Sequence, residues 1–430
     1  MRYSAISNSL FIKNRKKLSD TIKNKGIAII NSNDQMPRNG DQLFKYRQNS
    51  DFFYLTGIEQ EKSILVLNPN SEKEDEKETL FILKANKNLE IWEGHKLTKD
   101  EAIDISGIKN IKYISEFDAY LKDLLLNTET IYLNNNEYPK FSTPVPYKDL
   151  RFVNELKDKF PLHSFKRLAP ILTKLRLQKE PEEIELMQKA CDITTQAFHK
   201  ILKLIKPGIK EYEIEAEITS EFIRNGANGH AYEPIVASGK NSCVLHYISN
   251  DQICKDGDLV LMDFGAEYAN YSADTTRTVP VNGKFSERQR DVYDSVLHVM
   301  KKATELMIPG TSINKVNETV NQYIDKELIK LGLAEENLND KDKKETVRMK
   351  YFMHGTSHFM GLDVHDVGSK ETIFKPGMVM SCEPGIYIED EGFGIRLEND
   401  ILITTCKPID LLENEPIEAD EIERLMANRK

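Results

Sequence analysis

The sequence predicts a two-part protein of the mixed α/β (α+β) class. Its 430 residues exceed one typical domain, so two domains are expected. Runs with helical spacing alternate with short β-branched runs. The second part also contains a helix, a Pro-Gly turn and another helix twice, each time before a strand-rich stretch that carries acids. We therefore expect a smaller mixed domain over 1–170 and an internally duplicated domain over 171–430, with a site where its halves meet.

Composition excludes several classes of protein. Apolar residues make up 40% of the chain and charged residues 30%, as in ordinary globular proteins. The formal charge of −10 argues against a nucleic-acid binder, which would need basic patches. The N-terminal twenty residues lack the apolar core of a signal peptide, and no run is long enough to span a bilayer. Five scattered cysteines without a CxxC pair predict reduced thiols in a cytoplasmic protein.

The first part alternates helices and strands. Helical spacing over 7–25 ends at Gly26, and a short buried strand is expected at 27–30. Further strands are expected at 63–67, 80–83, 111–114 and 131–133, and a further helix at 118–126. The stretch 46–57 is expected to be a packed loop, although its aromatics Phe52, Phe53 and Tyr54 stay candidates for the wall of a site.

The second part begins with a long helix over 180–205, which has Pro181 in its first turn. A Pro-Gly pair at 207–208 stops this helix, and a second helix runs to about residue 225. Helices at 291–307 and 312–331 repeat the arrangement around a Pro-Gly pair at 309–310. This parallel favours an internal duplication.

The stretch from Leu259 to Val281 predicts two strands joined by a polar turn. With the turn centred near residues 268 and 269, Asp263 lies opposite Asp274. Opposed carboxylates repel each other, and a divalent cation between them would reverse that effect. The alternative is a shifted register in which one of the two carboxylates is solvated.

A second acidic region lies between residues 378 and 404. Glu383 ends a strand, and a single strand over 394–404 would place Arg396, Glu398 and Asp400 on one face. Buried charges of this kind need partners. A surface strand of alternating polarity is the alternative interpretation.

Three of the nine histidines, His354, His358 and His365, fall within twelve residues. The spacing of the first two suggests a zincin, but that motif needs a glutamate where Gly355 stands, so it is excluded.

The chain resembles the pita-bread metallopeptidases, and within them the Xaa-Pro aminopeptidases (aminopeptidase P). The motifs that carry the resemblance are LMDFGAEY, SADTTRT, HGTSHFMGLDVHDVG, EPGIYI and IRLEND. The stretch YRQNSDFFYLTG is similar to part of the family's N-terminal domain. The resemblance implies a C-terminal pita-bread (creatinase/aminopeptidase) domain. Creatinase-like proteins with this fold lack the metal ligands. The presence of these ligands in this chain argues against a creatinase-type role.

The resemblance also implies a site with two divalent metal ions. The implied ligands are Asp263, Asp274, His358, Glu383 and Glu398. The residues implied around the substrate are His246, His354, His365, Tyr387 and Arg396. This donor set suits Mn²⁺, with Co²⁺ or Zn²⁺ as alternatives.

By resemblance, Asp274 and Glu398 bridge the two ions, Asp263 binds one, and His358 and Glu383 bind the other. A hydroxide held between the ions would attack the peptide carbonyl, and Glu383 would transfer the proton to the leaving nitrogen. The other histidines would contact the substrate and the oxyanion, and Arg396 would fix the bridging acids.

The implied function is release of the N-terminal residue from peptides with proline second, by a homo-oligomer (dimer or tetramer). A prolidase, which performs the same chemistry on dipeptides, is one alternative. A non-catalytic binding protein with the same fold is another.

Overall fold

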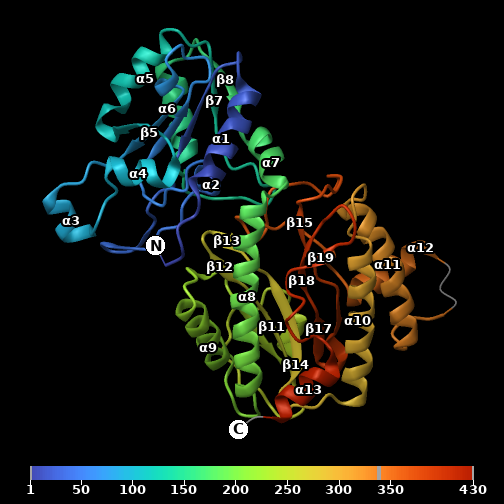
Figure 1. The fold of residues 1–430 in the computed structure, drawn as a ribbon. Helices are drawn as coiled ribbons and strands as arrows, with labels where there is room; N and C mark the ends of the chain where they lie inside the picture. Colours follow the sequence, from blue (N-terminus) through green and yellow to red (C-terminus); the bar gives the residue numbers. More distant parts are fainter. Residues whose placement is uncertain (1, 337–339, 429–430) are drawn as a thin grey trace. The chain divides into compact units, whose positions relative to one another are not determined.

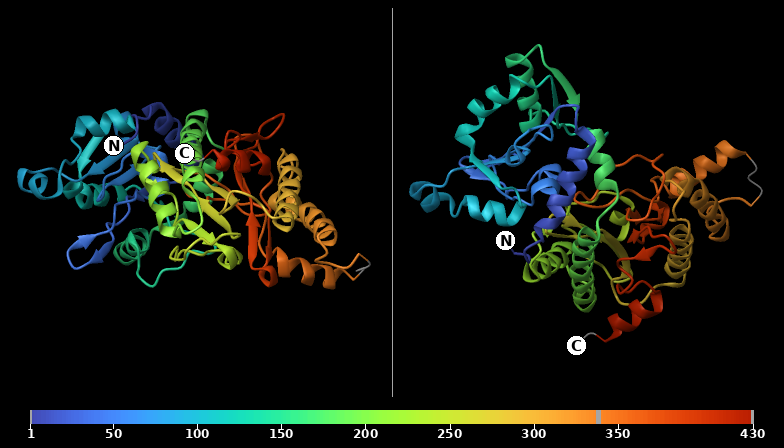
Figure 2. Two further views of the ribbon diagram at one scale, coloured as in Figure 1. Left: turned by 90° about the horizontal axis from the view of Figure 1, so that it is seen from below. Right: turned by 45° about the horizontal axis from the view of Figure 1, so that its top comes forward.

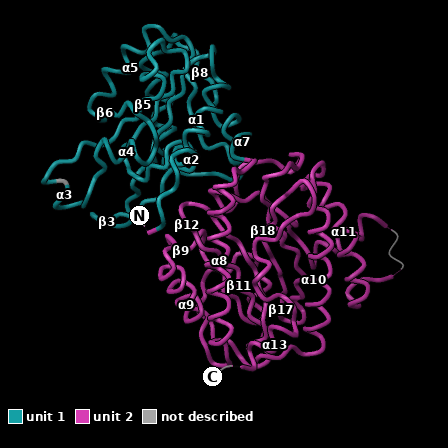
Figure 3. Tube along the Cα trace, viewed as in Figure 1, with its two compact units in different colours: residues 1, 3–176 teal, residues 2, 177–430 magenta. Residues whose placement is uncertain are grey.

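The computed structural model describes residues 2–336 and 340–428, which divide into two compact units (Figures 1 and 3). Unit 1 holds residues 3–176, and unit 2 holds residues 177–430 together with residue 2. Each unit has its own sheets and its own buried core. Over the described residues, every helix is too short or too polar to cross a membrane.

Unit 1 is built on one six-stranded sheet in the order β6-β5-β4-β1-β7-β8. The strands are β1 (Ile27–Asn31), β4 (Ile64–Leu67), β5 (Glu78–Ile82), β6 (Asn110–Tyr113), β7 (Thr130–Leu133) and β8 (Ser164–Arg167). Strand β1 is antiparallel to β4 and parallel to β7, so the sheet is mixed. Five of these strands confirm predicted ones to within two residues. The edge strand β8 lacked a hydrophobic signal because its residues are polar and largely exposed.

Helices cover this sheet, and a short hairpin extends from it. The helices are α1 (Asn8–Ile22), α2 (Ser50–Thr56), α3 (Lys87–Glu93), α4 (Lys99–Ser106), α5 (Phe117–Leu125), α6 (Lys148–Lys159) and α7 (Ala169–Leu177). The hairpin pairs β2 (Pro37–Asn39) with β3 (Gln42–Leu43). Apolar residues of β1, β4 and β7 pack against α5 and α6 in one core cluster.

The aromatic stretch of unit 1 is a buried helix rather than a loop. The side chain of Asn49 accepts hydrogen bonds from the first N–H groups of α2, and Gly57 ends the helix in the left-handed conformation (φ 68°). Phe52, Phe53 and Tyr54 are fully buried. The packing role expected for this stretch is confirmed. These rings lie in the interior of unit 1 and do not present an open wall.

Unit 2 begins with helices α8 (Pro181–Leu204) and α9 (Glu211–Arg224). Its later helices are α10 (Glu287–Glu305), α11 (Ile313–Lys330), α12 (Lys341–Tyr351) and α13 (Ala419–Ala427). The strands lie between the α8–α9 pair and the α10–α11 pair (Figures 1 and 2). Gly208 and Gly310, in the Pro-Gly turns, share a left-handed conformation with φ of 92° and 90°. Both helix pairs therefore turn in the same way, as a duplication would require.

The strands among the described residues of unit 2 form four small sheets. Their orders are β10-β11-β14, β13-β12-β9, β15-β18-β19 and β16-β17. The first two contain β9 (Gly229–His230), β10 (Ile235–Ser238), β11 (Leu259–Phe264), β12 (Ala266–Tyr268), β13 (Tyr271–Ser272) and β14 (Thr275–Pro280). The others contain β15 (Val379–Cys382), β16 (Gly385–Ile388), β17 (Phe393–Arg396), β18 (Asn399–Leu402) and β19 (Ile409–Asp410). The acids of both halves are carried by these strands or their ends.

The predicted hairpin register is wrong by two residues. The turn is centred on Ala269 and Asn270, which both have positive φ (51° and 65°). A turn centred one residue later moves each partner by two, so Asp263 pairs with Thr276 rather than with Asp274. Two consecutive left-handed residues are typical of type I′ turns, and asparagine tolerates this conformation well.

The predicted single strand over 394–404 is two strands. Strand β17 pairs with β16, whereas β18 pairs with β15 in a different sheet. At the break, the N–H of Glu398 donates to the carbonyl of Thr276 at 3.1 Å. The chain changes partners at this point because Glu398 bonds to the end of β14, in the other half of the unit.

Asp149 is a buried acid in unit 1. It lies on α6 with 3% of its surface exposed, and its carboxylate accepts a hydrogen bond from Asn31 at 2.9 Å. Burial raises its pKa from 3.8 to about 7, although the hydrogen bond from Asn31 acts in the opposite direction. The folded state therefore holds this proton at pH values where the unfolded chain has lost it.

We predict that Asp149→Asn reduces the pH dependence of stability. With the folded pKa raised, the contribution of Asp149 is complete below pH 3.8 and is lost as pH rises towards 7, by at most about 1.4 kcal/mol per pH unit. Calorimetric unfolding at pH 4.5 and 7.5 should show the wild type losing stability relative to the variant. The control is Asp158→Asn, at an exposed position of the same helix. If the difference in unfolding free energy between the wild type and Asp149→Asn is the same at both pH values, the prediction is contradicted.

Candidate functional site

A cavity of about 330 Å³ in unit 2 gathers residues from both duplicated halves. It is lined by Tyr232, Glu233, Ile235, Leu245, His246, Ile248, Asp263, Asp274, His354, His358, Val364, His365, Glu383, Arg396 and Glu398. Of the residues predicted for the site, all except Tyr387 line this cavity. Tyr387 is buried beside it and is hydrogen-bonded to two of the lining residues.

Strand ends position the four carboxylates. Asp263 lies on β11, and Asp274 directly precedes β14. Glu383 follows β15, and Glu398 directly precedes β18. The Thr276 hydroxyl donates to Glu398 Oε2 at 2.7 Å, which adds a side-chain bond to the backbone bond between the same two residues. This link joins β14 to β18 and holds acids from the two halves on one cavity.

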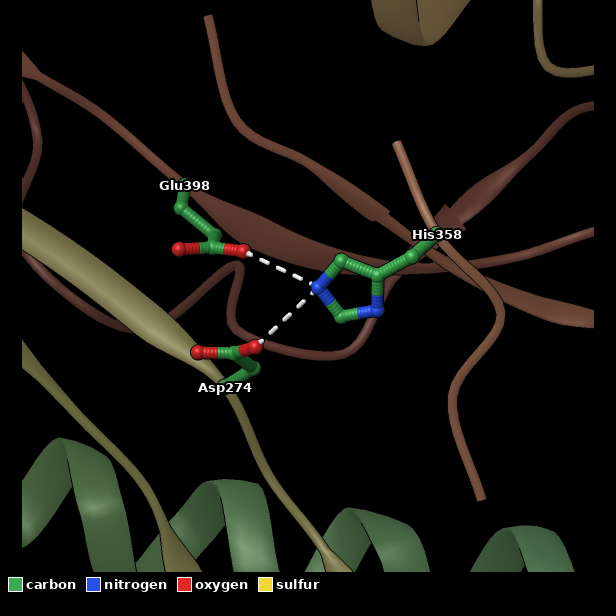
Figure 4. Close-up of side chains that lie close together, drawn as sticks. All are labelled: Asp274, His358 and Glu398. Atoms are coloured by element: carbon green, nitrogen blue, oxygen red, sulfur yellow. Dashed lines mark ion pairs between the residues drawn. The ribbon is translucent and has the colours of Figure 1, made fainter. Parts of the chain in front are cut away.

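One ring nitrogen of His358 faces the carboxylates of Asp274 and Glu398 (Figure 4). Its Nε2 is 3.4 Å from Asp274, 3.6 Å from Glu383 and 4.0 Å from Glu398. Burial alone would lower the pKa of His358. The hydrogen bond with Asp274 and the charge of Glu383 outweigh burial and raise the pKa to about 9.

The buried acids of the site repel one another. Burial, and then the neighbouring carboxylate of Asp263, raise the pKa of Asp274. Burial, and then Asp274, raise the pKa of Glu398 well above its ordinary value. Both side chains are almost inaccessible to water, with 6% and 3% exposed. The group therefore needs a compensating positive charge for its carboxylates to ionise together.

A divalent cation fits this group by geometry and by donor chemistry. Ligand atoms of Asp274, His358 and Glu398 all lie within 4.8 Å of one another. Carboxylate oxygens and an imidazole nitrogen are ligands for hard and borderline divalent ions. The spacing of the three residues and the raised pKa values of the acids both indicate a site that can hold a divalent cation.

Arg396 connects the acids to a histidine. Its Nη2 donates to Asp263 at 2.5 Å, its Nε donates to the Thr276 hydroxyl at 3.1 Å, and its Nη1 donates to the Tyr387 hydroxyl at 2.9 Å. The same hydroxyl is 2.8 Å from His354 Nε2. His354 Nδ1 is 2.8 Å from the carbonyl of Gly355, so both nitrogens of this ring have partners.

Tyr232 is a site residue that the sequence analysis missed. Its hydroxyl lies 2.6 Å from Asp263 and within hydrogen-bonding distance of Asp274. A single tyrosine in an unremarkable loop carries no sequence signal of its own. Its place in the site follows only from the structure, in which Ile235, three residues later, pairs with Asp263 across β10 and β11.

The remaining histidines and four aliphatic residues form the open part of the cavity. His246 and His365 are exposed, and the ring of His365 packs edge-on against His358 with centroids 4.4 Å apart. Apolar walls come from Ile235, Leu245, Ile248 and Val364. The buried aromatics Phe52, Phe53 and Tyr54, which were considered as wall candidates, are in the core of unit 1.

Comparison with known proteins matches both parts of the chain. The model for metallopeptidase family M24 matches residues 185–405, and the model for the aminopeptidase P N-terminal domain matches residues 11–132. The chain is 36% identical to the Xaa-Pro aminopeptidase of Escherichia coli, with 98% of each chain covered. It is 37% identical to that of Haemophilus influenzae, with 90% of each covered. A zinc-substituted structure of E. coli aminopeptidase P in complex with product matches with a TM-score of 0.89 at 35% identity, covering 99% of this chain and 100% of that one.

We predict that His358→Ala lowers the metal content of the purified protein, because its Nε2 lies among the clustered acids. His365→Ala is the matched control, since this ring packs against His358 but is exposed. Metal content is measured by elemental analysis after dialysis against dilute Mn²⁺. His365→Ala should retain nearly all of the metal, and equal loss in the two variants would remove the distinction between them.

Proposed function

Because the chain belongs to metallopeptidase family M24 and carries the aminopeptidase P N-terminal domain, we propose that it is an Xaa-Pro aminopeptidase. Membership of the family makes it a metallo-exopeptidase that acts on peptides. The proposed reaction is release of the N-terminal residue from peptides whose second residue is proline. We assign the catalytic domain to residues 171–430 and the N-terminal domain to residues 1–170.

The observation that carries this proposal is the meeting of four carboxylates and one imidazole on a single buried cavity. Two divalent cations would balance the four negative charges of these acids. The proposed ligands are Asp263, Asp274, His358, Glu383 and Glu398. We propose Mn²⁺ as the physiological ion because oxygen donors dominate the set, with Co²⁺ or Zn²⁺ as substitutes. When bound, the ions would supply Lewis-acid activation of a water molecule and of the substrate carbonyl.

Within this assignment, Asp274 and Glu398 would each supply a ligand to both ions. Thr276 holds Glu398 through its hydroxyl, and Arg396 and Tyr232 both bond to Asp263. These bonds fix the directions of the carboxylate oxygens before any ion binds. Preorganised ligands of this kind raise metal affinity and hold the reacting groups in register.

Glu383 is the proposed general base and acid. Its carboxylate lies at the cavity, with His354 Nδ1 3.7 Å from one oxygen and His358 Nε2 3.6 Å from the other. It would take a proton from the attacking water and deliver it to the departing proline nitrogen. Peptide hydrolysis needs both transfers, because the leaving imide nitrogen must be protonated.

The proposed substrate contacts are His246, His354 and His365, with Tyr387 and Arg396 behind them. Burial lowers the pKa of His354, so this ring is neutral, and the Tyr387 hydroxyl is within hydrogen-bonding distance of its Nε2. A proline ring is apolar and lacks an N–H group, so it suits a cavity with aliphatic walls. Ile235, Leu245, Ile248 and Val364 supply such walls here.

We also propose that the protein is a cytoplasmic homo-oligomer. All five cysteines are free thiols, as expected in a reducing compartment. Trp92 and Phe44 of unit 1 are 88% and 57% exposed, and we propose that another copy of the chain covers them.

We predict a strong preference for Xaa-Pro-Yaa over Xaa-Ala-Yaa tripeptides in the presence of Mn²⁺. The preference should be at least tenfold in kcat/KM, corresponding to about 1.4 kcal/mol of differential transition-state binding. Steady-state assays on matched peptide pairs measure it, and chelator should abolish both activities. Xaa-Pro dipeptides in the same panel test for prolidase activity. Faster cleavage of the alanine series would refute the assignment, even if the metal site proves correct.

A further inference from the structure

Unit 2 contains a fully buried ion pair outside the cavity, between Lys179 and Asp366. The ammonium nitrogen of Lys179 is 3.1 Å from Asp366 Oδ2, and each side chain is only 1% exposed. Neither residue is a proposed metal ligand, and neither lines the cavity. Burying two charges has a large desolvation cost, and removing one partner leaves the other without compensation. A pair of this kind constrains the two chain segments that carry it.

The Lys179 end of the pair is attached to rigid structure. Lys179 directly precedes Glu180, the N-cap residue of the 24-residue helix α8. Its backbone N–H donates to the carbonyl of Gly377 at 2.8 Å. The position of the ammonium group is therefore set by the start of helix α8 and by the segment at Gly377, which precedes β15.

The Asp366 end of the pair holds a loop of the site. Its backbone N–H donates to the carbonyl of Phe359 at 2.8 Å, which closes the loop over residues 359–366. Within this loop, the carbonyl of Gly361 accepts a hydrogen bond from the N–H of Ser272 at 2.9 Å. A Cβ atom at Gly361 would lie 2.2 Å from Asp366 Oδ2 and 2.9 Å from Lys179 Cε. Glycine at 361 is therefore what lets the loop close over the ion pair.

This loop presents His365 to the cavity. His365 directly precedes Asp366, is exposed, and packs its ring against His358. The backbone of this loop and the contact with His358 together determine where the His365 ring lies. The Asp366 carboxylate, one residue away from His365 and buried against Lys179, anchors that backbone.

We propose that the Lys179–Asp366 ion pair is the positioning device for His365, and that it acts on the reaction only through this histidine. The inference rests on the proposed function for its kinetic test. Lys179 and Asp366 are positioning residues in this account, because neither of them lines the cavity. The pair gives the exposed histidine a fixed backbone without adding a charge to the cavity.

The first test is a double-mutant cycle between the pair and His365. Rates are measured with a Xaa-Pro-Yaa peptide and Mn²⁺ for the wild type, Lys179→Met, His365→Ala and the double variant, and are given per folded, metal-loaded protein. We expect Lys179→Met to lower kcat/KM at least tenfold in the wild type but less than twofold in His365→Ala. If the ion pair instead supports the whole fold, Lys179→Met lowers kcat/KM by the same factor with and without His365. That outcome overturns the inference.

Asp366→Asn serves as the second variant, since its amide oxygen can still accept from Lys179. It should show the same dependence on His365 with a smaller effect. Lys302→Met, which breaks an exposed ion pair on α10 with Glu305, is the matched control and should leave kcat/KM unchanged. If neither Lys179→Met nor Asp366→Asn folds, the pair supports the whole unit and the inference is overturned.

Amide hydrogen exchange tests the inference independently of activity. In Lys179→Met, peptides covering residues 359–368 should exchange at least tenfold faster, while those covering β16 and β17 should be unchanged. Uniform acceleration across unit 2, or no change in 359–368, contradicts the inference. If the wild type shows no peptidase activity, but Lys179→Met accelerates amide exchange only in this loop, the proposed function is refuted and the positioning role stands.

Discussion

Mutual repulsion among buried carboxylates is the constraint on which the rest of this structure depends. Asp274 and Glu398 are nearly inaccessible to water, and Asp263 and Glu383 line the same cavity. Packing apolar groups around such acids does not stabilise their charges. The surrounding residues are consistent with a group built to receive cations. Donors from Arg396, Thr276 and Tyr232 orient the oxygens, and His358 Nε2 lies within 4 Å of three of the acids.

Bringing these acids together also explains the arrangement of unit 2. Each half contributes two acids at strand ends, and the halves meet where Glu398 bonds to Thr276. The break between β17 and β18 lies at this contact, because the chain must leave one sheet to reach the other half. A regular strand through residues 394–404 could not have placed Arg396 beside Asp263 and also directed β18 to β15. Sheet regularity is therefore interrupted at the position where the site is assembled.

The fold class was predictable from the sequence because its signals are local. Helices α8 to α11 are indicated by the spacing of their apolar residues and by the Pro-Gly turns. The two family models confirm the mixed N-terminal domain and the pita-bread domain. The hairpin register was not predictable, since moving the turn by one residue changes every partner. The strand pairing and the positive φ of Ala269 and Asn270 establish its place in the structure. Tyr232 and Lys179 were missed for another reason. Tyr232 contacts Asp263 and Lys179 contacts Asp366, each more than thirty positions away in the sequence, and periodicity does not encode such contacts.

The central claim is that the acidic cavity takes two divalent cations per chain, with Glu398 shared between them. The most direct measurement is titration of metal-free protein with Mn²⁺. Bound ions are counted by calorimetry and by the loss of the electron paramagnetic resonance signal of free Mn²⁺. The account predicts two ions per wild-type chain and a loss of affinity for both ions in Glu398→Gln, because one substitution removes a charge from each site. Binding of a single ion, or weakening of only one of two sites in Glu398→Gln, would contradict it.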